Sequence, residues 1–368
     1  MSIDRGRAGR ATISEVAAEA GVGRATAART LGNYGYVSPE LKERVLAAAE
    51  KLGYRANALA RSVSTGVSHT LGVIVADIGN PFFAGVVRGI SDAARAAGFD
   101  VIVLSTLESV AEEQSAVGVL LDKRVDGMII ATAAAERGDI SHLEQATQQG
   151  MPIVLVDRAV SRLQLDSVVI DNREATRRGV ASLVAAGHTR IGFVWGPTMP
   201  AAPISRRGVL AVAMAGLWTD GERLRGYLDA LDDAGIPFDG SLVTHAEKTE
   251  DGAAAATAHM LSQPDRPTAL FCTETDAITG ALRALRSLGL SYPTDVSLIG
   301  FDDSTWAAVM SPPLTMIEQP MLRLGALATE RLLAQIAGEE PAEATHTLQA
   351  RLVQRESVTP PAPGADLA

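Results

Sequence analysis

Apolar side chains near the start of the chain recur at helical spacing. Ile13, Val16 and Ala17 are followed by Ala20, and this spacing predicts a short helix with one apolar face. Gly21 comes next, and glycine readily adopts the positive φ that a tight turn between two helices requires. The pattern therefore predicts a helix that ends at a sharp turn.

Two further helices are expected to complete this N-terminal unit. The apolar positions of the second are Val22, Ala27 and Leu31. The third begins after Ser38 as N-cap, with Pro39 in its first turn, and its apolar stripe consists of Leu41, Val45, Leu46 and Leu52. Three helices with these spacings predict a helix-turn-helix, whose second helix lies in the major groove of DNA. A small helical bundle with solvated charges accounts for the spacing equally well.

Beyond residue 70, short apolar runs alternate with helical segments. The runs expected as strands are 71–77, 100–106, 125–132, 152–157, 167–171, 190–196, 269–274 and 295–302. Runs this apolar suit strands that are buried on both faces, and the helices between them favour right-handed parallel crossovers. The body is therefore expected to be α/β, with two doubly wound parallel sheets that bind ligands at the carboxyl ends of their strands.

Polar and aromatic residues stand where several of these runs end. They are Asp77 with Asn80, Phe82 and Phe83, then Asp157 and Arg158, Asp171 and Asn172, Glu274 to Asp276, and Asp302. This placement makes them candidates for ligand contact. Two other interpretations stay open: Phe83 belongs to the core, as most aromatic residues do, and Asp171 with Asn172 caps a helix.

Length and charge change the picture in one respect. The chain has 368 residues, too many for a single core, and a formal net charge of −10. Residues 1–66 hold ten Lys or Arg and six Asp or Glu, which leaves 23 and 37 for the remainder. A basic head on an acidic body is predicted, and only the head is expected to approach a phosphate backbone.

The remaining composition excludes several classes of protein. The lone cysteine, Cys272, rules out an internal disulfide and suits a reducing compartment. No signal peptide or membrane-spanning run is visible, so we expect a cytoplasmic protein without membrane association. The histidines are scattered without ligand spacing, so neither a metal nor another cofactor is expected. No glycine fingerprint follows the first body strand and no catalytic set of nucleophile, base and orienter is apparent, which argues against an enzyme.

Five motifs together resemble one known family. They are "TISEVAAEAGV", "YVSPELKERVLAAAEKLGYRANALARS", "NPFF", "GHTRIGFV" and "DVSLIGFDD…PPLT", spread from Thr12 to about Ser357. With them the chain resembles the lactose-repressor/galactose-repressor family of bacterial transcription regulators. The resemblance implies a helix-turn-helix head (1–56), a hinge helix (57–66), a first lobe (67–160 and 319–348), a second lobe (161–318 and 349–358) and a disordered tail (359–368). The two lobes are expected to have the fold of periplasmic binding proteins.

The resemblance implies two sets of DNA contacts. In the head they are Thr12, Arg24, Ala25, Thr26, Arg29 and Tyr36, and in the hinge Asn57, Ala60 and Val63. The hinge helices are expected to pair across a dimer and to press a side chain into the minor groove. The sequence departs from the family at Gly23, Ala27, Ala28, Ala56 and Val63, which trims the head core and shortens the minor-groove wedge.

The resemblance also implies an effector site between the lobes. Its expected residues are Asp77, Asn80, Phe82, Phe83, Asp157, Arg158, Arg223, Glu274, Asp276 and Asp302. Phe82 or Phe83 is expected to stack on a ring, while Asp302 and Arg223 grip hydroxyls or a charged group. Glu274 and Thr275 stand where the family has Asn-Asp, charged residues surround Lys248 where an aromatic wall is common, and residues 197–219 form an insertion. The insertion is expected to cover the site, to extend a helix or to contact a partner subunit.

The function expected from these features is that of a ligand-responsive transcription regulator, most simply a repressor. Two heads of a homodimer are expected to bind a pseudo-palindromic duplex operator under the control of a small sugar, polyol or related metabolite. The tail has no leucine heptads, so a dimer rather than a tetramer is expected. The alternative is a solute-binding protein with a vestigial or weak DNA-binding head.

Overall fold

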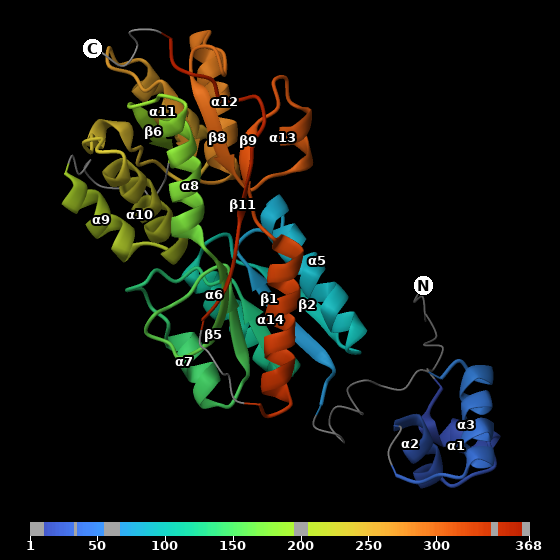
Figure 1. Ribbon diagram of the computed structural model, residues 1–368. Helices are drawn as coiled ribbons and strands as arrows, with labels where there is room; N and C mark the ends of the chain where they lie inside the picture. Colours follow the sequence, from blue (N-terminus) through green and yellow to red (C-terminus); the bar gives the residue numbers. More distant parts are fainter. Residues whose placement is uncertain (1–10, 33–34, 55–66, 195–204, 340–344, 363–368) are drawn as a thin grey trace, which may run out of the picture. The chain divides into compact units, whose positions relative to one another are not determined.

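The protein is described here from a computed structural model that covers residues 11–32, 35–54, 67–194, 205–339 and 345–362. Its internal contacts divide the chain into two units, Met1–His69 and Thr70–Ala368, which we call the head and the body. Figure 1 shows the helical head and the α/β body.

The head is formed by three helices, as its apolar spacing predicts. They are α1 (Ile13–Glu19), α2 (Arg24–Gly32) and α3 (Pro39–Lys51). Gly21 has a φ of +61°, which confirms the expected turn, and Arg44 Nη2 donates to the carbonyl of Ala20 at 2.6 Å, across that turn. One core prediction is wrong, because Leu46 is 48% exposed. The face of α3 that meets the other helices carries Val45, Ala48 and Ala49 instead, and position 46 lies one residue off it.

The first lobe of the body is built on a six-stranded parallel sheet in the order β10-β5-β4-β3-β1-β2. The strands are β1 (Thr70–Val75), β2 (Asp100–Ser105), β3 (Gly127–Ile130), β4 (Ile153–Val156), β5 (Asp166–Ile170) and β10 (Thr345–Leu348). Helices α5 (Pro81–Ala96) and α14 (Met321–Ile336) pack into one hydrophobic cluster with this sheet. Helices α6 (Val110–Lys123) and α7 (Ser141–Gln148) pack into a second cluster with it.

The second lobe is built on a five-stranded sheet in the order β11-β9-β8-β7-β6, in which only β11 runs antiparallel. The strands are β6 (Ile191–Val194), β7 (Ala269–Cys272), β8 (Ser297–Phe301), β9 (Thr315–Glu318) and β11 (Arg351–Val353). The helical elements are α8 (Asn172–Ala185), α9 (Arg206–Ala215), α10 (Trp218–Asp233), η1 (Gly240–Leu242), α11 (Glu250–Leu261), α12 (Thr275–Leu288) and α13 (Thr305–Val309). All eight predicted strands are confirmed. The short strands β9, β10 and β11 were not predicted, because none is a long apolar run.

The expected boundary between the lobes at residue 160 is wrong. Strand β5 was placed in the second lobe, but it pairs in parallel with β4, where Val154 lies opposite Asp166. Parallel neighbours usually need a long crossover, and here the loop 157–165 suffices without a helix. The first lobe therefore extends to the end of β5.

The expected disordered tail is also partly wrong, since residues 359–362 are part of the fold. The amide of Thr359 donates to Ser297 Oγ at 3.0 Å, and its carbonyl accepts a hydrogen bond from Ser297 Oγ at 3.0 Å and lies 2.9 Å from His188 Nε2. His188 is 1% exposed, so the tail is held by a buried polar group rather than by apolar side chains. Composition could not reveal that contact.

The chain passes between the lobes three times, at residue 171, at 319–320 and at 349–350. Asp171 ties the first passage to the third, because its Oδ1 accepts from the amide of Ala350 at 2.7 Å. Arg178 donates to Asp171 Oδ2 at 3.0 Å and to the carbonyl of Ala350 at 2.8 Å. The cap interpretation of Asp171 is wrong in one detail: its side chain makes no capping hydrogen bond to α8 and joins two chain segments instead.

Glycines allow α5 and α14 to pack closely. A Cβ on Gly325 would lie 2.1 Å from the carbonyl oxygen of Val86, and one on Gly89 would lie 2.2 Å from that of Leu322. Backbone atoms cannot move aside as a flexible side chain can. In the described parts of the chain, no helix combines the length and the apolarity needed to cross a bilayer.

The variant Gly325→Ala is expected to destabilise the body by about 1–3 kcal/mol, because the added methyl group overpacks the α5–α14 contact. Gly118→Ala in α6 is the matched control, since a Cβ there meets nothing within 4 Å. The control is expected to gain about 0.5–1 kcal/mol from helix propensity. Chemical denaturation of both variants measures the difference, and equal midpoints would contradict the close packing.

Candidate DNA-binding surface and interlobe site

The second helix of the head presents a polar, cationic face. Arg24, Ala25 and Arg29 are exposed and Thr26 is half-buried, while the side chain of Tyr36 is 86% exposed. Neither arginine makes an ion pair or hydrogen bond with the described residues, so both guanidinium groups are available to a partner. Asn57, Ala60 and Val63 lie outside the described residues.

Thr12 has a structural role in the head. Its Oγ1 accepts from the amide of Glu15 at 3.3 Å, and its own amide donates to Glu15 Oε2 at 2.6 Å, which completes a capping box at the start of α1. The bond from the Thr12 amide, together with one from Thr12 Oγ1 to Glu15 Oε2 at 3.0 Å, holds the pKa of the Glu15 carboxyl group below its ordinary value. The DNA contact expected of Thr12 stays a prediction beside this observed role.

Thr12→Ala is expected to increase amide hydrogen exchange in the first turn of α1 by about fivefold, the effect of a lost N-cap. Thr12→Ser keeps the hydroxyl and is expected to exchange like the parent protein. Unchanged exchange in Thr12→Ala would show that the hydroxyl does not stabilise the helix. Hydrogen–deuterium exchange without DNA measures this separately from any DNA contact.

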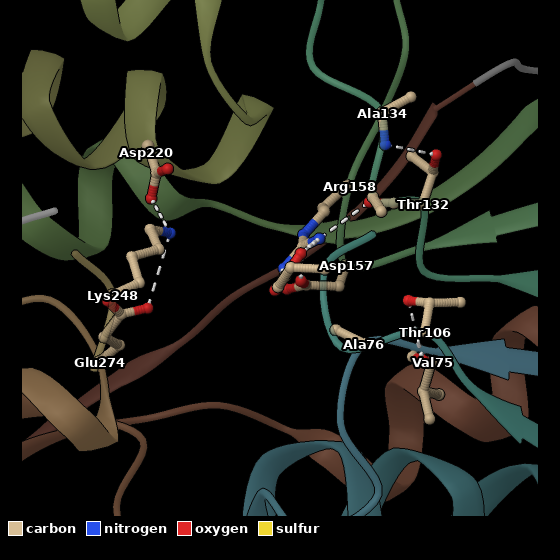
Figure 2. A network of polar contacts seen from close by, with 12 residues as sticks. Val75, Ala76, Thr106, Thr132, Ala134, Asp157, Arg158, Asp220, Lys248 and Glu274 are labelled. Atoms are coloured by element: carbon tan, nitrogen blue, oxygen red, sulfur yellow. Dashed lines mark hydrogen bonds and ion pairs between the residues drawn. The ribbon is translucent and has the colours of Figure 1, made fainter. Parts of the chain in front are cut away.

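In the body, Arg158 is the centre of a charged cluster on the first lobe. It follows β4, is 5% exposed, and donates from Nη1 and Nη2 to the two carboxylate oxygens of Glu108 at 2.7 and 2.6 Å. Nη1 also donates to the carbonyl of Thr132 at 2.8 Å (Figure 2). The fully buried Glu113 holds this turn by accepting from Thr132 Oγ1 at 2.8 Å and from the amide of Ala133 at 2.5 Å.

Lys248 is the centre of a second cluster, on the second lobe. Its Nζ donates to Asp220 Oδ1 at 2.7 Å and lies 3.6 Å from Glu274 Oε2. Figure 2 shows this group opposite Asp157 and Arg158. The clusters affect each other electrostatically, because Asp220 raises the pKa of Arg158 and Lys248 contributes to lowering that of Glu108. We call the two clusters, with the residues between them, the interlobe site.

Arg223 lies in the same site and is held by neutral groups. Its Nε donates to Asn172 Oδ1 at 2.8 Å and its Nη1 to the carbonyl of Thr273 at 2.6 Å. The guanidinium carbon also lies 3.9 Å from the centroid of the Phe301 ring, a cation–π contact. These contacts position Arg223 without using an acidic side chain.

Asp157 and Asp302 occupy equivalent places in the two lobes. Each follows the last residue of a parallel strand, β4 or β8, and adopts a left-handed backbone, with φ of +68° and +69°. Burial raises the pKa of both carboxyl groups, and the Asp302 carboxylate also opposes ionisation of Asp157 and Glu274. Two non-glycine residues in this conformation at facing strand ends mark a functional site.

Several buried polar atoms of the interlobe site have no hydrogen-bond partner among the described residues. They are Asp157 Oδ1, Arg158 Nε, Asn172 Nδ2 and Gln319 Oε1. Gln319 uses its other end, Nε2, to donate to Asp302 Oδ1 at 2.5 Å. Buried polar groups are rarely left unpaired in native proteins, so this arrangement is suited to a polar ligand with both donors and acceptors.

The structure assembles five of the expected effector residues and disperses the others. Asp157, Arg158, Arg223, Glu274 and Asp302 form the interlobe site with Asn172, a candidate for ligand contact or for a helix cap, and with Glu108, Asp220, Lys248 and Gln319, which were not expected there. Lys248 had a sequence signal, since it stands in a charged stretch where an aromatic residue is common. Glu108, Asp220 and Gln319 had no signal strong enough, because their partners are distant in sequence.

The remaining expected residues are Asp276, in the first turn of α12, and four residues of the segment 77–83. Asn80 caps α5 by accepting from the amide of Phe82 at 2.9 Å, and Phe83 packs in the core at 4% exposure. Phe82 is equally buried but lines a cavity of about 510 Å³ together with Asp302. Asp77 and Asp276 are exposed residues. The carboxyl group of Asp276 is nevertheless partly desolvated, which raises its pKa, and the charge of Asp77 adds to that rise. Stacking of a ring on either phenylalanine stays a prediction.

The described part of the insertion contacts the first lobe. Helix α9 packs against α10, and the carbonyl of Gly216 accepts from the amide of Glu136 at 3.0 Å. Glu136 lies in the loop after β3, and Arg162 anchors that loop by donating to the carbonyls of Glu136 and Gly138 at 3.0 and 2.6 Å. The insertion therefore adds a link between the lobes beside the interlobe site.

Asp302→Asn is expected to stabilise the body at neutral pH. When the pKa of a carboxyl group is raised in the folded state, the free energy of unfolding falls as the pH rises from the ordinary pKa of 3.8 through the raised pKa. Asparagine carries no charge, so the variant avoids this loss of stability. Asparagine also tolerates the left-handed backbone and can still accept from Gln319. The gain in thermal midpoint over the parent should be larger at pH 8 than at pH 5.

Asp303→Asn is the matched neighbour and is expected to have the opposite effect. Asp303 accepts from both Nη atoms of Arg355, at 2.8 and 2.7 Å, so its charge is paired and its role is structural. Losing that pair should lower the thermal midpoint. A midpoint for Asp302→Asn below that of the parent at pH 8 would contradict the assignment of Asp302 as an uncompensated carboxylate.

Comparison with known proteins covers both units. A family model of bacterial regulatory proteins of the lacI family matches residues 12–57, and one of periplasmic binding proteins and the sugar-binding domain of the LacI family matches residues 68–356. The chain is 31% identical to catabolite control protein A of Priestia megaterium over 334 residues, which cover 91% of this chain and 95% of that protein.

Two solved structures are similar over nearly the whole chain. The complex of the transcriptional regulator CelR with cellobiose has a TM-score of 0.68 and 31% identity, covering 95% of this chain and 100% of that one. The lac repressor dimer bound to operator and the anti-inducer ONPF has a TM-score of 0.81 and 26% identity, with the same coverage. Head and body thus occur together in these relatives.

Proposed function

Because this chain belongs to the LacI family of bacterial transcription regulators, we propose that it is a ligand-responsive repressor that binds a pseudo-palindromic operator as a homodimer. The observation that carries the proposal is the presence, in one chain, of a helix with two exposed arginines and of a site lined by polar atoms that have no hydrogen-bond partner among the described residues. The first suits a polyanion and the second a small polar effector. A repressor that acts on operator DNA is expected to work in the bacterial cytoplasm.

The proposed effector is a sugar or related polar metabolite held between the lobes. The CelR complex with cellobiose supports this class, and so do the unpaired donors and acceptors of the interlobe site. A ligand that contacts Asp157 and Asp302 joins strand ends of different sheets and therefore favours one relative arrangement of the lobes. Control of DNA binding then requires only that this arrangement and its alternative differ in operator affinity.

Two alternatives are less well supported. A solute-binding protein has no use for the exposed arginines of α2, and the relatives named above are transcription regulators along the same length. We also propose that the protein is not an enzyme. Its interlobe carboxylates are engaged by arginine, lysine or glutamine. Ser297 and Thr268 do hydrogen-bond to His188, but Ser297 and His188 are each 1% exposed and hold the carbonyl of Thr359, which is a structural role.

Arg24→Gln is expected to weaken operator binding by about tenfold or more, because arginine pairs with a guanine edge through two hydrogen bonds. The preferred inverted repeat is first selected from a randomised duplex pool, and affinity is then measured by mobility shift at several salt concentrations. Arg29→Gln is expected to behave in the same way.

Lys51→Gln is the control with the same change of charge. Lys51 Nζ lies 2.5 Å from Glu19 Oε1, so its charge is already paired within the head. Its effect on affinity should be small and the same for any sequence. Equal losses in Arg24→Gln and Lys51→Gln would exclude a base-reading role for Arg24, and the absence of any selected sequence would contradict the proposed function.

A further inference from the structure

The interlobe site contains more acid than base. Its carboxyl groups are Glu108, Asp157, Asp220, Glu274 and Asp302, and its cations are Arg158, Arg223 and Lys248. With every group in its ordinary charge state, five acids face three bases. A buried site with such an excess is unfavourable unless something else compensates it.

Two of the three cations are paired with other acids, whereas the charge of Arg223 favours the ionised forms of Asp157 and Asp302. Arg158 forms a two-pronged pair with Glu108, and Lys248 lies between Asp220 and Glu274. Arg223 directs two of its nitrogens to the neutral oxygens of Asn172 and Thr273.

Asp157 and Asp302 are the acids left without full compensation. Asp302 has no ion pair with any described residue and accepts one hydrogen bond, from the neutral Gln319. Asp157 Oδ2 forms an ion pair with Arg158 Nε at 3.3 Å, but its Oδ1 has no hydrogen-bond partner among the described residues although the side chain is only 6% exposed. Figure 2 shows Asp157 directed toward the Lys248 cluster.

We propose, on the basis of the proposed function, that the effector carries a positively charged amino group that binds between Asp157 and Asp302. An ammonium offers three donors and can therefore bond to both carboxylates and still reach Gln319 Oε1. Asn172 Nδ2 remains as a donor for a hydroxyl oxygen of the same ligand. The ligand class is a small hydroxylated amine, such as an amino sugar.

The other charge classes fit the site less well. An anionic ligand such as a sugar phosphate adds to the acid excess, and it gains a cation only by taking Arg158 or Lys248 from its buried acidic partner. A neutral sugar binds through hydroxyls but leaves the two carboxylates uncompensated. Lys248 itself shows that an ammonium suits this environment, since it rests between two carboxylates of the second lobe.

The ionisation of the site supports the same ligand. Burial raises the pKa of Asp157, Glu274 and Asp302, and Asp302 adds to the effect on Asp157. A bound cation stabilises the ionised carboxylates and lowers these pKa values again. Binding of an amine is therefore expected to strengthen as the pH rises through the raised pKa values, until the amine itself loses its proton.

The test uses the thermal midpoint of the full-length protein and ligands that differ only in charge. Methylammonium chloride is the minimal probe, compared with sodium chloride, methanol and sodium methyl phosphate at matched ionic strength. Glucosamine, galactosamine and mannosamine are compared with glucose, galactose and mannose and with their 6-phosphates. Methylammonium is expected to raise the midpoint where the other minimal probes do not, and one amino sugar is expected to bind about tenfold or more tightly than its neutral counterpart.

Two variants locate the effect. Asp302→Asn is expected to abolish the response to methylammonium, and its own raised midpoint without ligand shows that the loss is not due to misfolding. Asp303→Asn, altered at the neighbouring structural carboxylate, is expected to retain the response. A response that survives in Asp302→Asn would overturn the proposed position.

Outcomes in which no amine acts, or in which neutral sugars or phosphates act more strongly than amines, overturn the proposed ligand class. Such a failure is distinguishable from failure of the proposed function, because selection of an operator and the Arg24→Gln comparison need no effector. A protein that binds an inverted repeat and ignores amines is a repressor with an effector of another charge. One that responds to amines but selects no DNA sequence keeps the ligand site and loses the repressor function.

Discussion

The cost of burying charge is the constraint on which the body depends. Five carboxyl groups and three cations converge where the strands of two sheets end, in an environment where an unpaired ion is expensive. Arg158 and Lys248 are each neutralised within their own lobe, by Glu108 and by Asp220 with Glu274. Asp157 and Asp302, one acid from each lobe, are only partly compensated, by Arg158 and Arg223, so the site keeps an excess of negative charge that a cationic ligand can remove.

This arrangement relates ligand binding to the relative position of the lobes. Three chain passages join them, and Asp171 with Arg178 ties two of the passages together. The remaining passage, at 319–320, carries Gln319, whose side chain contacts Asp302. A ligand that binds beside Asp302 therefore lies next to the passage 319–320, whose backbone must change when the lobes move relative to each other. The hydrogen bond from Glu136 to Gly216 also opposes separation of the two lobes at the insertion.

Much of the architecture could be predicted from local patterns. The apolar runs located eight strands, Gly21 and Pro39 marked a turn and a helix start, and the uneven charge separated head from body. Local patterns failed where the deciding contact was distant. Strand β5 joins the first sheet by pairing with β4 and β10, and Thr359 is held by His188 and Ser297. The core prediction for Leu46 was wrong for a different reason. Helical spacing does not determine how wide the buried face of a helix is, and here alanines fill that face.

The candidate site shows the same division between local and distant information. Motif resemblance placed Asp157, Arg158, Arg223, Glu274 and Asp302 at strand ends or in the cleft, and the structure brings them together. By itself the sequence determined the elements and the kinds of side chain at their ends, because periodicity and turn chemistry act between near neighbours. Only the tertiary structure decided which charges are paired and which are left over. Arg158 is 50 residues from Glu108 in the sequence, and Lys248 is 28 residues from Asp220. The net charge that a buried site presents to a ligand depends on such pairings between distant residues.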